Sequence, residues 1–192
     1  HSIRGILSGT LAYLFNIYDG TRPFSAIVRE AREMGYTEPD PRDDLSGMDV
    51  ARKLTILARE LGQSIEIGDF PVQNLVPEPL RDVPVGEFLE RLGDYDGDIK
   101  TLYHEAAREG RKLRYVASLD DRGNAAVGLE KVDAHDAFGN MQLTDNLVQF
   151  QSDRYAKNPL VIQGPGAGPE VTAGGVFGDV LKLAAFLGDG GL

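Results

Sequence analysis

Apolar residues recur every three or four positions over long stretches of the chain, the spacing that puts them on one face of a helix. The predicted helices span Ser8–Tyr18, Phe24–Met34, Ser46–Leu61, Val85–Leu92, Ile99–Arg108 and Val171–Leu187. Gly35 and Gly62 follow the second and third segments, at the position where glycine commonly ends a helix. In the last segment six apolar residues are expected to face inward, namely Val176, Phe177, Val180, Leu181, Ala184 and Leu187.

Other segments alternate apolar and polar residues, which is typical of a strand with one buried face. The predicted strands span Val72–Leu75, Leu113–Leu119, Ala125–Val132, Asn146–Gln151 and Leu160–Gln163, the last of which is expected to be buried. The sequence DDRGN at residues 120–124 is typical of a hairpin turn. Because helices come first and consecutive strands later, the sequence predicts an α+β fold, with helices packed on one face of a mixed, largely antiparallel sheet.

A charged segment, GYTEPDPRDDLSGMDVARK, occupies residues 35–53. Its loop holds four acidic residues, Glu38, Asp40, Asp43 and Asp44. Each of the two prolines restricts the residue before it, so Glu38 and Asp40 should be extended and the loop should be stiff. A rigid loop of this charge density is more typical of a binding surface than of a packed interior.

Asp49 and Lys53 lie one turn apart in the helix that follows this loop, so their side chains share one face. Lys53 falls beside the apolar stripe of that helix, which should leave its ammonium group only partly solvated. A carboxylate and an ammonium group near further carboxylates suit a small zwitterionic substrate with a proton to move. Two structural roles fit the same spacing: Asp49 could form a capping box with Ser46, or the two side chains could make an ordinary exposed ion pair.

The composition argues against several classes of partner. The chain of 192 residues has a net charge of −10 and a pI near 4.7, so it offers no basic face to nucleic acid or to an anionic membrane. It contains no cysteine, and its three histidines lack the spacing of metal ligands, so neither a disulfide nor a metal site is predicted. No continuous apolar run reaches the length of a membrane span, and we expect a cytoplasmic protein.

The run GPGAG at residues 164–168 lies between the last predicted strand and the last predicted helix. Phosphate-binding loops occupy such places, but the spacing matches neither G-x-G-x-x-G nor the P-loop, and Pro165 removes one backbone donor. A sharp turn with close backbone packing is the alternative interpretation. We divide the chain here, into a substrate-binding, catalytic and dimerisation domain at residues 1–163 and a glycine-rich turn with its helix at residues 164–192.

Three motifs together resemble homoserine dehydrogenases. They are the charged segment at residues 35–53, GILSGT at residues 5–10, and GPGAG with the following VTAGGV at residues 164–168 and 171–176. The version with Arg42-Asp43-Asp44 is most similar to the form in bifunctional aspartokinase/homoserine dehydrogenases. The resemblance implies the reversible, NADP- or NAD-dependent interconversion of aspartate semialdehyde and homoserine, a step in threonine and methionine biosynthesis.

The same resemblance implies roles for individual residues. Lys53 would act as the acid/base or stabilise the alkoxide, and Asp49 would hold the hydroxyl or amino end of the substrate. Glu38 and Asp44 would bind the substrate's ammonium group. Weaker contacts are expected from Asp43, Gly9 and Thr10.

In this family the dinucleotide is bound mainly by a half that precedes the region resembled here, so no cofactor-binding residue is assigned within this chain. The helix after the glycine run returns to that half, and the family forms its dimer through the region that this chain resembles. We therefore expect a homodimer, and we expect the chain on its own to be inactive. The alternative is a non-catalytic dimerisation or amino-acid-binding module that needs a separate nucleotide-binding partner.

Overall fold

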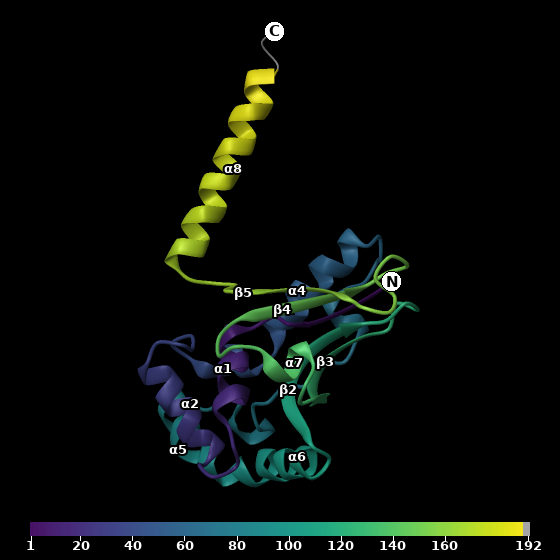
Figure 1. Cartoon of the computed structure of the whole chain (residues 1–192). Helices are drawn as coiled ribbons and strands as arrows, with labels where there is room; N and C mark the ends of the chain where they lie inside the picture. The colour runs from purple at the N-terminus through teal and green to yellow at the C-terminus, as the bar shows by residue number, and fades with distance from the viewer. Residues whose placement is uncertain (190–192) are drawn as a thin grey trace.

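A five-stranded sheet lies at the centre of the fold, which the computed structural model describes over residues 1–189 (Figure 1). Its strands are β1 (Ser2–Ile6), β2 (Arg111–Leu119), β3 (Ala125–Asp133), β4 (Asn146–Gln151) and β5 (Leu160–Gly164). They are arranged in the order β3-β2-β1-β4-β5, and each neighbouring pair is antiparallel. The helices are α1 (Gly9–Ile17), α2 (Phe24–Glu33), α3 (Pro41–Leu45), α4 (Met48–Glu60), α5 (Val85–Arg91), α6 (Asp96–Arg108), α7 (Ala137–Asn140) and α8 (Pro169–Asp189), with 3-10 turns η1 (Ile67–Asp69), η2 (Glu78–Leu80) and η3 (Leu92–Tyr95). The predicted α+β class is confirmed.

The main core lies between the sheet and the helices that pack on one of its faces. Leu113, Tyr115, Ala117 and Leu119 alternate along β2, and all four are buried in one apolar cluster with residues of α1, α2 and α4. Burial of a leucine-sized side chain contributes about 1.5–3 kcal/mol to folding. The packing therefore holds α1 and α4, which carry predicted site residues, firmly against the same sheet.

The central strand, β1, is a strand that the hydrophobic pattern did not predict. It is five residues long, and its pairing places Ile3 opposite Leu119 on one side and Phe150 on the other. Gly5 interrupts the apolar alternation. A side chain does not fit at this position, because a Cβ atom there would lie 2.8 Å from the Leu7 side chain and 3.0 Å from the Leu147 carbonyl oxygen. Close packing at the middle of the sheet thus removes the pattern by which a strand is recognised.

Two of the predicted strands differ from those observed. Residues 72–75 make a single parallel bridge, between Val72 and Val127. The ladder goes no further because the Gln73 carbonyl oxygen accepts from Tyr115 Oη and the Leu75 N–H donates to the Leu45 carbonyl oxygen. The strand predicted at residues 160–163 is confirmed as β5, but it is exposed, with Ile162 57% accessible. It is the outermost strand of the sheet, and no helix within residues 1–189 covers it.

Helix α8 projects away from the sheet (Figure 1). Six of its apolar residues were predicted to face inward, and this is wrong: Phe177 is 62% accessible and Leu187 is 66% accessible. By length and composition Pro169–Gly188 could cross a membrane, although the sequence pattern predicted no apolar run of that length. A single such helix is weak evidence for a span, and an Asp179–Lys182 ion pair lies near its middle. Charged groups near the middle of a span are costly in a bilayer.

Candidate active site

A cavity of about 590 Å³ lies between the start of α1, the charged segment and the glycine run. Six of the seven predicted site residues line it, namely Gly9, Thr10, Glu38, Asp44, Asp49 and Lys53. Asp43 is not among the lining residues, and its side chain is exposed to solvent. The structure therefore brings together residues from three separate motifs of the sequence.

The start of α1 forms one wall of the cavity. Ser8 caps the helix, with its Oγ accepting a hydrogen bond from the Leu11 N–H at 3.2 Å, which satisfies one of the free donors of the first turn. Thr10 Oγ1 donates to the carbonyl oxygen of Tyr36 at 2.7 Å and so ties α1 to the charged segment. Gly9 approaches the Thr144 carbonyl closely, since a Cβ would lie 3.2 Å from its oxygen.

Lys53 and Asp49 form an ion pair on the exposed side of α4. Lys53 Nζ lies 2.7 Å from Asp49 Oδ2 and also donates to the Leu7 carbonyl oxygen at 2.9 Å. The Lys53 side chain is 43% accessible, which confirms the predicted partial solvation. The capping box is wrong, because Gly47 occupies the N-cap position with φ of 74°, and the described hydrogen bonds join Asp49 to no helix N–H. The pair is thus an ion pair that faces a cavity.

Glu38 and Asp44 meet across the loop that precedes α4. Asp44 Oδ2 accepts a hydrogen bond from the Glu38 N–H at 2.8 Å. Burial raises the pKa of the Asp44 carboxyl above its usual value, an effect opposed by that hydrogen bond and reinforced by the charges of Glu38 and Asp43. The predicted extended conformation is confirmed at Asp40, with φ of −105° and ψ of 107°, but the residues after it form the short helix α3 instead of a loop.

The cavity combines three carboxylates with one ammonium group. All three carboxylates lie on the charged segment, but Asp49 is paired with Lys53, whereas Glu38 and Asp44 have no cationic partner among the residues that line the cavity. An amino acid would place its ammonium group near Glu38 and Asp44 and a reacting oxygen near Lys53, which can donate or accept a proton. Burial of such a ligand away from water would strengthen these charge interactions.

The opposite wall contains Thr144 and Asn146, which the sequence reasoning missed, and part of the glycine run, to which it assigned no substrate contact. Thr144, Asn146 and the run Pro165–Pro169 all line the cavity. Asn146 Nδ2 donates to the Leu7 carbonyl oxygen at 3.4 Å, while its Oδ1 is buried without a hydrogen-bond partner among the described residues. A Cβ on Gly166 would lie 2.0 Å from Asn146 Nδ2, so this glycine is needed for close packing. The interpretation of the glycine run as a closely packed turn is confirmed at Gly166, whereas a Cβ on Gly164 or Gly168 would meet nothing within 4 Å.

Comparison with known proteins places this chain in an enzyme family. The family model of homoserine dehydrogenase matches residues 1–181. A bifunctional aspartokinase/homoserine dehydrogenase 2 of Arabidopsis thaliana is 49% identical over 188 residues, which cover 97% of this chain and 20% of that protein. A homoserine dehydrogenase of Schizosaccharomyces pombe is 48% identical over 94% of this chain and 50% of its own length. A crystal structure of a Candida auris protein of unknown function superimposes with a TM-score of 0.89, at 44% identity, over 96% of this chain and 53% of that one.

The chain therefore belongs to the homoserine dehydrogenase family. It spans about half the length of the Schizosaccharomyces pombe relative and about a fifth of the bifunctional Arabidopsis thaliana relative. The resemblance inferred from the three sequence motifs is confirmed at the level of the family.

Proposed function

We propose that this chain is the substrate-binding and proton-transfer part of a homoserine dehydrogenase, which interconverts aspartate semialdehyde and homoserine with NADP or NAD. The observation that carries the proposal is the single cavity that holds Lys53, Asp49, Glu38 and Asp44. Membership of the family and the identity of about half of the residues with named homoserine dehydrogenases support it.

In the proposed chemistry the cofactor accepts the hydride and Lys53 handles the proton. The nicotinamide cofactor would supply the hydride acceptor for homoserine oxidation. As a neutral amine Lys53 would take the hydroxyl proton, or as an ammonium group it would stabilise the alkoxide, with its Nζ held by the Leu7 carbonyl and Asp49. Glu38 and Asp44 would hold the substrate's ammonium group.

The residues of this chain do not match a dinucleotide-binding site. Within residues 1–189 every pair of neighbouring strands is antiparallel, whereas the dinucleotide fold requires parallel strands joined through a helix. We therefore infer that the cofactor is held mainly by another part of the protein, and that the exposed apolar surface of α8 packs against it. We also propose that two copies associate, since the exposed strand β5 leaves an apolar edge of the sheet uncovered.

The test compares this chain alone with a protein that joins it to a nucleotide-binding domain, here termed the joined enzyme. We expect the joined enzyme to oxidise homoserine with NADP or NAD, and the chain alone to give no measurable rate. Both oxidation rates are measured from the absorbance of the reduced nicotinamide. If a folded joined enzyme bound the cofactor but did not oxidise homoserine, the proposed function would be wrong.

The affinity for homoserine should depend on pH through Asp44. Because burial raises the pKa of Asp44 above 3.8, the carboxyl takes up a proton earlier on acidification than an ordinary aspartate does. The protonated form has no charge with which to attract an ammonium group, so KM for homoserine should rise as pH falls through the folded pKa of Asp44, by up to about tenfold per pH unit below that pKa. The free energy of unfolding depends on pH in the opposite direction. The folded state binds this proton more tightly than the unfolded state does, so the stability that Asp44 contributes is lost as pH rises from 3.8 through its folded pKa.

The dependence is measured as KM against pH in the joined enzyme, with Asp44→Asn and Asp43→Asn as the matched pair of variants. Asp44→Asn should raise KM and remove most of this pH dependence. Asp43→Asn should leave KM at neutral pH nearly unchanged, because the Asp43 side chain does not line the cavity, and should shift the pH dependence slightly towards lower pH, because the charge of Asp43 helps to raise the pKa of Asp44. A pH profile that persisted in Asp44→Asn would assign the proton to another group.

A further inference from the structure

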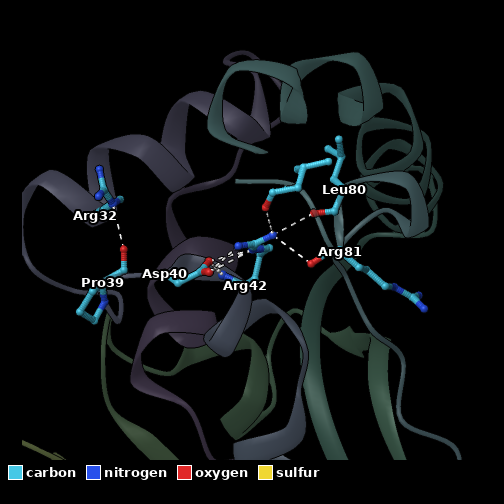
Figure 2. A network of polar contacts seen from close by, with 7 residues as sticks. Arg32, Pro39, Asp40, Arg42, Leu80 and Arg81 are labelled. Carbon is cyan, nitrogen blue, oxygen red and sulfur yellow. Dashed lines mark hydrogen bonds and ion pairs between the residues drawn. The ribbon is translucent and has the colours of Figure 1, made fainter. Parts of the chain in front are cut away.

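Arg42 joins the charged segment to a distant part of the chain through a dense set of hydrogen bonds (Figure 2). Its Nη1 donates to three backbone carbonyl oxygens, those of Leu80 at 3.2 Å, Arg81 at 2.9 Å and Val83 at 2.6 Å. These residues lie at the end of η2 and in the turn before α5, about 40 residues further along the chain. Arg42 therefore holds α3 against the η2–α5 turn.

The other side of the same guanidinium group binds Asp40. Arg42 Nε and Nη2 both donate to this carboxylate, the latter at 2.7 Å, in the bidentate geometry that arginine alone among the basic side chains can offer. Asp40 also accepts from the Arg42 N–H at 3.0 Å and so caps the start of α3. The Arg42 side chain is 17% accessible and lies over the ring of Phe88, with 5.5 Å between the guanidinium carbon and the ring centroid.

The direction of α3 depends on this clamp. A five-residue helix is too short to be stable by its own hydrogen bonds, so tertiary contacts must hold it. Asp44 lies on α3 two residues after Arg42, and Glu38 lies two residues before Asp40. The hydrogen bond from the Glu38 N–H to Asp44 Oδ2 closes the loop between them. Arg32 adds a second support on the same loop, since its Nε donates to the Pro39 carbonyl oxygen (Figure 2).

We propose that Arg42 is a positioning residue for the substrate: it does not line the cavity, but it fixes α3 so that Asp44 and Glu38 meet at the ammonium site. This inference rests on the proposed function, because it assigns a substrate affinity to that carboxylate pair. It adds a residue outside the cavity whose loss should change the affinity for the amino acid, while the proton-transfer pair on α4 stays in place.

The test uses Arg42→Ala and Arg42→Lys in the joined enzyme. We expect KM for homoserine to rise about tenfold or more, as for the loss of charge-assisted hydrogen bonds, while kcat and KM for the nicotinamide cofactor change by less than about threefold. Lysine keeps the charge but cannot bind Asp40 and three carbonyls together, so its effect should resemble that of alanine. Arg59→Ala is the matched control, because the ion pair of Arg59 with Glu66 is exposed and distant from the cavity lining.

Amide hydrogen exchange gives a readout that needs no activity. The Glu38 N–H should exchange faster in both Arg42 variants than in the unchanged protein, because Asp44 no longer holds it. Unchanged exchange there, or unfolding of both variants, would overturn the inference. So would an unchanged KM for homoserine in the Arg42 variants when Glu38→Gln raises it. If Glu38→Gln also left KM unchanged while exchange at Glu38 rose, the ammonium site of the proposed function would be wrong and the clamp would stand.

Discussion

Replacing Lys53 by alanine is expected to lower the turnover of homoserine by about 10² or more, the usual effect of losing a general acid or base. Lys53 carries the one ammonium group among the described residues that line the cavity, and its Nζ is fixed by the Leu7 carbonyl at 2.9 Å and by Asp49. Stability should change little, because the side chain is 43% accessible and lies beside the buried stripe of α4. Steady-state rates and thermal unfolding of the joined enzyme measure the two effects separately.

The matched control is Arg52→Ala on the same helix. Arg52 is exposed and does not line the cavity, so the loss of this positive charge should leave turnover nearly unchanged. Near-normal turnover in Lys53→Ala would mean that the Asp49–Lys53 contact is a surface ion pair of the ordinary kind. Unfolding of Lys53→Ala would instead give the contact a structural role, and either result would contradict the mechanism.

Replacing Gly47 by alanine is expected to lower the free energy of unfolding by about 2–5 kcal/mol, from backbone strain and overpacking together. Gly47 has φ of 74°, which L-residues with a side chain rarely adopt, and it connects α3 to α4. A Cβ there would lie 1.9 Å from Tyr115 Oη, whose hydroxyl donates to the Gln73 carbonyl oxygen at 2.6 Å. Burial raises the pKa of Tyr115, so the phenol remains a neutral donor at that site. Denaturant unfolding of the chain measures the loss.

Gly62→Ala separates the two contributions. Gly62 ends α4 with φ of 79°, but a Cβ there would meet nothing within 4 Å, so alanine should cost only the strain of about 1–2 kcal/mol. In the Tyr115→Phe background Gly47→Ala should cost less than in the unchanged chain, because the hydroxyl nearest to the new methyl group is gone. Equal losses of unfolding free energy in Gly47→Ala and Gly62→Ala would show that the Tyr115 side chain moves aside at no measurable cost.

Periodicity predicted the long helices well, because the buried stripes of α1, α2 and α4 face one continuous core. It failed at β1 and α3, which are five residues each and obtain their stability from neighbours distant in the sequence. The hydrophobic pattern alone did not predict the exposure of α8 and β5; for α8, only the family resemblance, in which this helix returns to a nucleotide-binding half, indicated an exposed apolar surface. An apolar pattern indicates that a surface tends to be buried, but it does not indicate whether the same chain or another one buries it.

The sequence singled out some residues of the candidate site and missed others. The spacing of Asp49 and Lys53 and the density of charge in their segment were sufficient to single out one wall of the cavity. Asn146 lies on the opposite wall and had no such signal, since an asparagine at the start of a strand is ordinary in sequence. Its position becomes informative only when the fold brings it to the Leu7 carbonyl, which Lys53 also binds.

Helix α8 leaves the sheet through the short glycine run that follows β5. Lys53 is anchored through Leu7 next to the central strand, so the proposed proton acceptor is fixed to the sheet. Under the proposed function, whatever covers α8 would carry the hydride acceptor. The distance over which hydride passes would then depend on the angle at which α8 leaves the sheet, whereas the proton acceptor would keep its place on the sheet.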